Sequence, residues 1–407
     1  MEPTPLDLPE FDGAFLNAYQ CVCFVRVCVF LTCCGRPLGA SLEGFFPPQA
    51  EAGEPMDVSQ DGPELGGAEG PLEVRQFGGG HANLTYLLRF GDSEFVLRRP
   101  PLGPVAPRSH DMKREHQVLA AISEVFSLAP SSYVYCEDAS IIGADFHILE
   151  RRHGIVIREE LPERFQGRPE LNRAIGEMII DSLASLHMVD AEAAGLGDLG
   201  RPDGFVNRQL EGWAGRWQAA KEEDDPKIDR TVKWLEDNFP KSHQVTLLHN
   251  DYKLDNMMVG ADDPSQAVAI FDWDMCTRGD PLMDLGYLLN FWNEAGDDPG
   301  WIEASPMPTW HEGFPTRAEA VARYGEKTGF DVGAMRWYHV FGVFKIAVVL
   351  QQIYIRYLRG QTQDERFAVF DERVASLADK AVVLAEKCQP PVLPEPLTRH
   401  APLPSLK

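Results

Sequence analysis

Residues 247–260 read LLHNDYKLDNMMVG, and this stretch constrains the fold of the chain more than any other. Between an apolar run and a Met-Met-Val run it places two carboxylates, a histidine, a lysine and two asparagines, among them His249, Asp251, Lys253 and Asn256. A loop between two strands can be polar merely because water covers it, so the argument depends on the spacing of these side chains. We therefore look for a reaction that needs these side chains at this spacing, and for a fold that carries it.

The spacing matches the requirements of phosphoryl transfer. That reaction needs little covalent help from a protein, but it needs an acceptor hydroxyl held in line and positive charge at the γ-phosphate. Kinase catalytic loops place His two residues before the catalytic Asp and a metal-binding Asn five residues after it. His249, Asp251 and Asn256 reproduce this arrangement. Lys253 falls where a cation can reach the transferred group, so we predict Asp251 and Lys253 as catalytic residues.

A carboxylate at the end of a predicted strand indicates a metal site. The apolar run AVAIF leads into Asp272, and Mg²⁺ prefers oxygen ligands while it keeps waters and substrate phosphates at its other positions. We therefore predict Asn256 and Asp272 as Mg²⁺ ligands. The segment FDWDMCT also allows an alternative, a phosphohydrolase with an aspartyl nucleophile at Asp272. Against it, Cys276 stands where such an enzyme has Thr or Val, and the motif comes late in the chain.

Polar residues nearer the N-terminus predict contacts to nucleotide phosphates. A glycine-rich turn between two predicted strands lets the backbone approach phosphates closely, although hairpin turns are often glycine-rich as well. Arg98 ends the next strand, where it could reach the α- and β-phosphates, and Glu115 on the following helix could hold it by an ion pair. The residues predicted in and after the turn are Gly79, Gly80, Asn83 and Thr85. Each feature alone is a weak sign of nucleotide binding. Their order along one chain indicates nucleotide binding more strongly than any one of them does.

Composition limits the partners of the chain. Its 62 acidic and 38 basic residues give a formal charge of -24, which disfavours binding to nucleic acid or to an anionic membrane surface. Five of the eight cysteines lie within residues 21–34 without the spacing of a disulfide framework, and the acidic residues before them do not suit a signal peptide. The apolar run VFGVFKIAVVL is short for a membrane span and contains Lys345, so we predict a buried core helix there. We expect a cytoplasmic protein.

The length and the composition of the chain predict its domain organisation. With 407 residues it exceeds the size at which one hydrophobic core usually stops growing, so we expect two lobes, at residues 70–152 and 153–390. Residues 36–71 are rich in Gly, Pro, Glu and Asp and show little periodicity, which indicates a disordered linker. We predict a disordered extension over residues 1–69, which includes the Cys-rich apolar segment, and a flexible tail over residues 391–407.

The hydrophobic periodicity differs between the two lobes. Alternating runs joined by short turns predict an antiparallel sheet in the first lobe, with strands at 73–77, 84–90, 95–99, 132–136 and 145–150. One helix is expected among them, at 110–124. The second lobe is predicted to contain two short strands, at 244–249 and 266–272, and helices at 170–189, 205–220, 227–238, 281–293, 316–328, 333–358 and 364–388. The expected fold class is α+β.

Five segments, in this order along the chain, resemble the aminoglycoside phosphotransferase family: GGGHANLTY, FVLRRPP, LASLHMVD, HNDYKLDN and FDWDMCTRGDPLMDLGYLL. The resemblance extends over residues 72–388 and is strongest to the branch related to the kinase-like half of some acyl-CoA dehydrogenase fusion proteins. It implies a protein-kinase-like fold, with a small antiparallel sheet in the first lobe, a mainly helical second lobe and ATP in the cleft between them. The adenine would then lie at the hinge near Glu150, Arg151 and Arg152.

The resemblance also implies roles for individual residues. Asp251 would act as the catalytic base, and Asn256 and Asp272 would bind Mg²⁺. Asp280 and Asp284 would shape the loop and the helix that follow, and both could cap that helix, because carboxylates suit a helix N-terminus.

Three residues depart from the pattern of the family. Kinases usually have Lys where Arg98 stands, and the planar fork of arginine binds phosphate differently. Asn250 replaces the Gly of the common His-Gly-Asp, which could restrict the backbone of the loop. His81 stands where a small residue is usual. These departures motivate an alternative, a pseudokinase that binds nucleotide and acts as an interaction module.

The function we expect is ATP- and Mg²⁺-dependent phosphorylation of a hydroxyl on a small molecule. The dehydrogenase-linked branch favours a hydroxylated acyl group, such as a CoA thioester, over an aminoglycoside, although the acidic composition would suit a polycationic drug. The two histidines near these motifs, His187 and His249, are expected to be structural.

Overall fold

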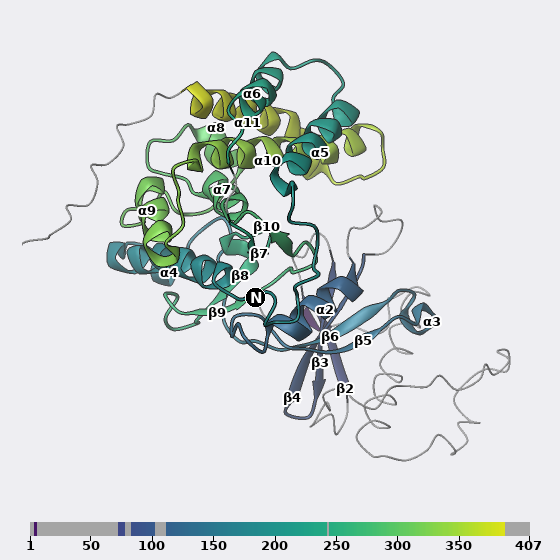
Figure 1. Cartoon of the computed structure of the whole chain (residues 1–407). Coiled ribbons are helices and arrows are strands. Elements are labelled where there is room, and N and C mark those ends of the chain that lie inside the picture. Colours follow the sequence, from purple (N-terminus) through teal and green to yellow (C-terminus); the bar gives the residue numbers. More distant parts are fainter. Residues whose placement is uncertain (1–3, 6–71, 78–82, 102–110, 242–243, 387–407) are drawn as a thin grey trace, which may run out of the picture.

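The computed structural model describes residues 4–5, 72–77, 83–101, 111–241 and 244–386. These residues form two lobes, one built around an antiparallel sheet and one mainly helical (Figure 1). The predicted α+β class and the two-lobed arrangement are thereby confirmed. Apart from residues 4–5, the predicted extension at 1–69 lies outside the described residues, as does the predicted tail at 391–407.

The first lobe contains a sheet whose described strands follow the order β1-β2-β3-β4-β6-β5, with antiparallel neighbours. These strands are β1 (Thr4–Pro5), β2 (Leu72–Gln76), β3 (Leu84–Phe90), β4 (Ser93–Arg99), β5 (Ser132–Cys136) and β6 (Phe146–Glu150). Leu88, Phe95 and Ile148 belong to a buried hydrophobic cluster of this sheet. Helix α2 (Met112–Ile122) packs against β5 and β6, and the short helix α3 (Ala139–Ile142) was not predicted.

The second lobe is built around helix α10, which packs against α5, α7 and α11 (Figure 1). The helical elements of this lobe are η1 (Glu163–Phe165), α4 (Pro169–His187), α5 (Phe205–Ala220), α6 (Pro226–Asp237), α7 (Leu282–Phe291), α8 (Pro299–Ala304), α9 (Arg317–Thr328), α10 (Met335–Leu358), η3 (Glu365–Val369) and α11 (Phe370–Glu386). The helix predicted at 364–388 is therefore divided into η3 and α11. Helix α8 was not predicted, because six residues show little periodicity.

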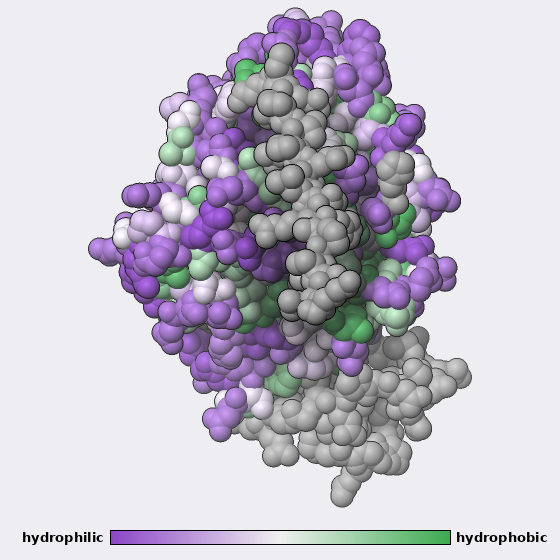
Figure 2. All heavy atoms as spheres, turned by 60° about the vertical axis from the view of Figure 1, so that its left-hand side comes forward, coloured by the Kyte–Doolittle hydropathy of each residue, from purple (hydrophilic) through white to green (hydrophobic). Residues whose placement is uncertain are grey.

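Helix α10 is the helix of the described residues that could span a membrane by length and composition. In the structure 67% of its most apolar window is buried inside the molecule, and Lys345 is among its buried residues. The prediction of a buried core helix is therefore confirmed. Among the described residues on the face shown in Figure 2, hydrophilic side chains predominate.

Two small antiparallel sheets position the predicted catalytic loop, residues 249–256. They pair β7 (Thr246–Leu248) with β10 (Thr277–Gly279) and β8 (Met257–Val259) with β9 (Ala267–Ile270). The loop connects β7 to β8 and ends in the 3-10 turn η2 (Leu254–Asn256). Because Met257 lies opposite Ile270, Asn256 and the residues after Ile270 meet at one end of the hairpin. Strands β8 and β10 were not predicted, since a three-residue strand shows almost no alternation.

The chain passes from the first lobe to the second beside β8. Ile155 N–H donates to the Val259 carbonyl at 2.9 Å, and Val259 N–H donates to the Ile155 carbonyl at 2.8 Å. These bonds bring Gly154 very close to β8: an added Cβ would lie 2.4 Å from the Val259 carbonyl oxygen and 2.7 Å from Met258 Cγ. Glycine is therefore required at this position because only a residue without Cβ allows the approach.

Gly154→Ala should lower the free energy of unfolding by about 1–3 kcal/mol, because the added methyl group must displace β8 from the junction of the lobes. Gly215→Ala is the matched control: a Cβ at Gly215 in α5 meets nothing within 4 Å, and alanine stabilises a helix interior by roughly 1 kcal/mol. Denaturant unfolding of both variants and the parent measures the difference. A Gly154→Ala variant as stable as the parent would contradict the close approach.

Candidate active site

Three side chains hold the Asp251 carboxylate. Tyr287 on α7 donates its hydroxyl to Asp251 Oδ1 at 2.5 Å, and Asn256 Nδ2 donates to Asp251 Oδ2 at 2.7 Å. Lys253 Nζ lies 3.4 Å from Asp251 Oδ1. The structure thus brings together Asp251 and Lys253, the two residues predicted as catalytic, and places a donor on each carboxylate oxygen.

Neighbouring groups from the loop and from α7 keep the Asp251 carboxyl ionised. Burial raises the pKa of the Asp251 carboxyl, but Lys253 and the Tyr287 hydroxyl are the chief groups that lower it, and the resulting pKa lies below its ordinary value. Burial lowers the pKa of Lys253, whereas Asp251 and Asp255 raise it, with a net increase. The pair therefore consists of a carboxylate and an ammonium near neutral pH. Asp255 differs, because burial raises its pKa although Lys253 lies 3.8 Å away.

The residue before the catalytic aspartate has an unusual backbone conformation. Asn250 has a φ of 66°, which lies in the left-handed region. Asparagine tolerates this region better than most non-glycine residues do, and Asn250 Nδ2 also donates to the Met275 carbonyl at 2.8 Å. Asn250, which stands where the family commonly has glycine, therefore adopts a left-handed backbone that glycine would also allow.

The buried carboxylate of Asp284 on α7 fixes the backbone of the loop. Asp284 Oδ2 accepts the His249 N–H at 2.6 Å, and Asp284 Oδ1 accepts the Asn250 N–H at 2.8 Å. His187 Nε2 lies 3.3 Å from Asp284 Oδ2. The prediction that Asp284 caps α7 needs correction, because its hydrogen bonds go to the preceding loop and to α4. Asp280 does support the start of α7, since its Oδ1 accepts the Leu282 N–H at 2.9 Å.

His249 joins the loop to the segment after β9. Its Nε2 donates to the Phe271 carbonyl at 2.8 Å, and Asp251 N–H donates to its Nδ1 at 3.3 Å. Both bonds form together when the proton is on Nε2. His249 is fully buried, and so is His187, whose Nδ1 lies 2.7 Å from the Tyr324 hydroxyl. These contacts agree with the expectation that both histidines are structural.

Asn256 and Asp272, the predicted Mg²⁺ ligands, lie at the same end of the β8–β9 hairpin. Phe271 N–H donates to the Asn256 carbonyl at 2.8 Å. Asn256 Nδ2 donates to both the carbonyl and the carboxylate of Asp251, which turns its Oδ1 away from that residue. Asp272 has a left-handed φ of 70°, a strain typical of functional sites. An amide oxygen and a carboxylate are hard donors, and the residues present therefore fit Mg²⁺.

Arg98 on β4 connects the two lobes by ion pairs. Its Nε lies 3.2 Å from Glu115 Oε2 on α2, and its Nη2 pairs with Asp272 Oδ1. Trp273 N–H donates to Glu115 Oε1 at 3.2 Å, and His147 Nε2 lies 3.2 Å from Glu115 Oε2. Burial raises the pKa of Glu115, but Arg98 and His147 lower it, with a net decrease to about 2. The predicted pair of Arg98 and Glu115 is present, and it extends to Asp272.

Of the remaining residues predicted to contact phosphates, Thr85 lies beside Arg98, and the turn residues are outside the described part of the chain. Thr85 lies opposite Arg98 in the β3–β4 ladder, so both side chains face the same side of the sheet. Asn83 precedes β3 and is buried. The turn residues Gly79, Gly80 and His81 lie outside the described residues.

The predicted hinge residues have protein contacts of their own. Glu150, at the end of β6, accepts the Ser131 N–H at 3.0 Å, and its other oxygen lies 2.7 Å from Arg152 Nε. The Arg151 guanidinium lies 5.0 Å from the centroid of the Phe77 ring. Adenine binding at Glu150 and Arg151 stays a prediction.

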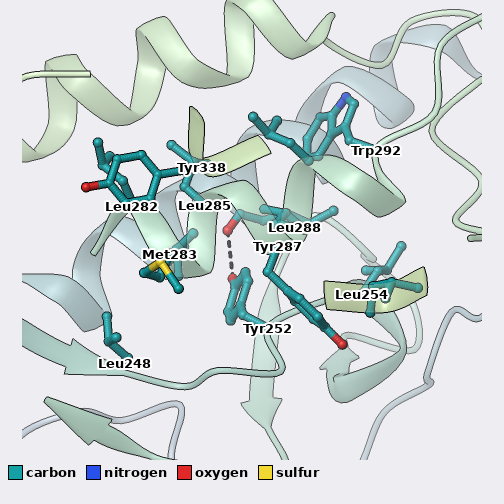
Figure 3. Packing of buried hydrophobic residues seen from close by; sticks show 14 of the residues in the cluster. Leu248, Tyr252, Leu254, Leu282, Met283, Leu285, Tyr287, Leu288, Trp292 and Tyr338 are labelled. Carbon is teal, nitrogen blue, oxygen red and sulfur yellow. Dashed lines mark hydrogen bonds between the residues drawn. The ribbon is translucent and has the colours of Figure 1, made fainter. Parts of the chain in front are cut away.

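Sequence reasoning missed Tyr287 and the contact of Lys345 with the loop. Figure 3 shows Tyr287 extending from α7 toward the segment that carries Tyr252 and Leu254. Lys345 on α10 donates to the Asn250 carbonyl at 2.8 Å. The one available signal was the spacing of Asp284 and Tyr287, which puts both on one helix face.

A small pocket borders the loop beside Lys253. Its lining consists of Arg158, Lys253, Leu254, Asp255, Phe291, Pro306 and Met307. Lys253 Nζ lies 5.4 Å from the centroid of the Phe291 ring. The pocket thus combines two cations and one carboxylate with apolar side chains.

Substitutions of Asn250 separate the effect of its φ from that of its side chain. Asn250→Ala should lower the free energy of unfolding by about 1–2 kcal/mol, because alanine resists the left-handed region. Asn250→Gly should cost less, since glycine adopts that φ freely even without the bond to Met275. Thermal and denaturant unfolding provide the comparison. Equal losses in the two variants would show that the side-chain bond, and not φ, decides.

Comparison with known proteins shows the family of the chain. Residues 73–338 match the model of the phosphotransferase enzyme family. The acyl-CoA dehydrogenase family member 11 of Gallus gallus is 31% identical over 324 residues, which cover 78% of this chain and 41% of that protein. The chain therefore spans less than half the length of this relative.

Solved structures show the same fold. A Ralstonia eutropha protein assigned as an aminoglycoside phosphotransferase is 28% identical with a TM-score of 0.68, and the match covers 80% of this chain and 95% of that one. A thermostable mutant of the aminoglycoside phosphotransferase APH(4)-Ia, in complex with AMP-PNP and hygromycin B, is 16% identical with a TM-score of 0.50 over 78% of this chain and 96% of that one. The chain belongs to the phosphotransferase enzyme family and has its kinase-like fold.

Proposed function

We propose that this protein is an ATP-dependent kinase that phosphorylates a hydroxyl group of a small molecule. The most direct support is the Asp251 carboxylate, which is held between Tyr287 and Asn256 beside the Lys253 ammonium. A carboxylate in this position orients an attacking hydroxyl and accepts its proton. The ammonium beside it balances negative charge on the transferred phosphoryl group.

Residues from both lobes would bind the nucleotide. Arg98 and Thr85 share one face of the sheet, where they would meet the phosphates of ATP. Glu115 holds Arg98 at the junction of the lobes by its ion pair. Asn256 and Asp272 would hold Mg²⁺, which supplies, when bound, positive charge that stabilises the phosphate oxygens.

The pocket beside Lys253 supports a proposal for the acceptor. We propose a hydroxylated acyl group, such as an acyl-CoA thioester, because Lys253 and Arg158 suit an anionic part and Phe291 and Met307 suit an acyl chain. A polycationic aminoglycoside would meet two cations there, which is unfavourable. The similarity to a protein named as an acyl-CoA dehydrogenase family member points the same way. The cytoplasmic location stays a prediction.

Asp251→Asn should reduce Mg²⁺-ATP turnover by a factor on the order of 10² or more, because the amide cannot accept the proton of the acceptor hydroxyl. The affinity for ATP should change little, since the carboxylate acts in the transition state. Steady-state turnover to ADP, together with the dissociation constant for ATP, measures both quantities.

Asp262→Asn is the matched control, because Asp262 is an exposed carboxylate in the turn that follows the same loop. It should keep the turnover of the parent. Parent-like turnover in Asp251→Asn would overturn the catalytic assignment. ATP binding without turnover in the parent, across a panel of small alcohols, would favour the pseudokinase.

Arg158→Ala should raise the KM for a hydroxyacyl-CoA acceptor about two- to fivefold and leave the KM for ATP unchanged, because it removes one exposed cation from the pocket. Arg164→Ala serves as the control, since Arg164 lies over Phe165 and does not line the pocket. ADP release with hydroxyacyl-CoA, the free hydroxy acid and an aminoglycoside identifies the acceptor class. Stimulation by the aminoglycoside alone would contradict the acyl proposal.

A further inference from the structure

Two side chains from different helices reach the catalytic loop from inside the second lobe. Tyr287 on α7 donates its hydroxyl to Asp251 Oδ1 at 2.5 Å. Lys345 on α10 donates from Nζ to the Asn250 carbonyl at 2.8 Å, and the same Nζ lies 4.2 Å from the centroid of the Tyr287 ring. One cation therefore touches both the loop and the tyrosine that binds its carboxylate.

We propose that Tyr287 and Lys345 form a positioning pair, which sets the orientation of the Asp251 carboxylate from the core of the second lobe. The proposal rests on the proposed role of Asp251 as the residue that receives the acceptor hydroxyl. Neither Tyr287 nor Lys345 needs to touch substrate, because both act through Asp251 and the backbone beside it.

The carboxylate needs this support because rotation about its last bond is soft. Asn256 binds Oδ2 and belongs to the loop itself, whereas Tyr287 binds Oδ1 from a helix. Two donors on opposite oxygens fix the plane of the group. Tyr287 is buried, and its ring packs edge-on against Phe291 with centroids 5.2 Å apart, so its hydroxyl has a fixed place.

The hydrogen bond to Asn250 and the contact with the Tyr287 ring offset the cost of burying Lys345. A buried ammonium is costly unless it is paired or hydrogen-bonded, and burial lowers the pKa of Lys345 to about 8. The charged groups near it are Asp251, Asp284, Lys253 and Arg216. A cation over the face of a tyrosine ring is attracted to it, and its charge also favours donation by the phenol hydroxyl.

A second buried lysine provides a comparison within the same lobe. Lys380 on α11 donates from Nζ to the Asn290 carbonyl of α7 at 2.7 Å and is 1% exposed. It resembles Lys345 in burial and in its bond to one backbone carbonyl, but this carbonyl lies in a helix and not in the catalytic loop. Loss of Lys380 should therefore affect stability without affecting the catalytic step.

The test compares variants by Mg²⁺-ATP hydrolysis with water as the acceptor. Tyr287→Phe removes only the hydroxyl and should lower kcat about tenfold with an unchanged KM for ATP. Lys345→Met should lower kcat by a similar factor, and Lys345→Arg should restore part of it. Because the two residues act as one unit, the double variant should lose little more than the larger single loss. Lys380→Met should unfold more easily and keep the kcat of the parent.

The outcomes separate this inference from the proposed function. Parent-like kcat in Tyr287→Phe, alongside an inactive Asp251→Asn, overturns the positioning pair and leaves the proposed function intact. A Tyr287→Phe variant faster than the parent also overturns it, because the hydroxyl would then block the place of the acceptor. Losses that multiply in the double variant show two independent effects and overturn the pair. Absence of Mg²⁺-ATP turnover in the parent with water and with every small alcohol of the panel, or parent-like turnover in Asp251→Asn, overturns both proposals together.

Discussion

The active site depends on the buried carboxylate of Asp284. A carboxylate taken out of water is stable only when donors surround it, and Asp284 finds them in the N–H groups of His249 and Asn250 and in His187. Burial raises its pKa, yet these contacts bring the pKa below its ordinary value. The loop must therefore pass directly over α7, which brings Asp251 within reach of Tyr287. The left-handed φ of Asn250 follows from the same requirement, because both successive N–H groups turn toward one side chain.

A second constraint joins the two lobes at Arg98. Its planar fork presents Nε to Glu115 and Nη2 to Asp272, so one side chain pairs with a carboxylate from each lobe. Glu115 adds a bond from Trp273 N–H, which holds the segment after β9 against α2. Arg98, which stands where kinases usually have lysine, therefore pairs both with Glu115 and with Asp272. This link and the register of β8 and β9 position Asp272 and Asn256, the proposed Mg²⁺ ligands.

Family membership and fold give the class of reaction, phosphotransfer. One fold can host many different functions, because function depends on the site that the fold carries. In this chain the surface proposed for the acceptor is the pocket that joins Arg158 and Lys253 to Phe291 and Met307. The proposal of an acyl acceptor rests on the mixture of cations and apolar side chains in this pocket.

The sequence by itself determined the two-lobed α+β fold, most element positions and the polar spacing of the loop, because periodicity and the spacing of Asp251 from Asn256 are properties of short segments. Short elements such as β8 and α8 escaped it, since a few residues hold too little pattern. Only the tertiary structure decided which core residues meet the loop. The bond from Asn250 to Asp284 spans 34 positions and the bond from Lys345 to Asn250 spans 95. No local pattern encodes which face of a distant helix packs beneath a loop, because packing selects it.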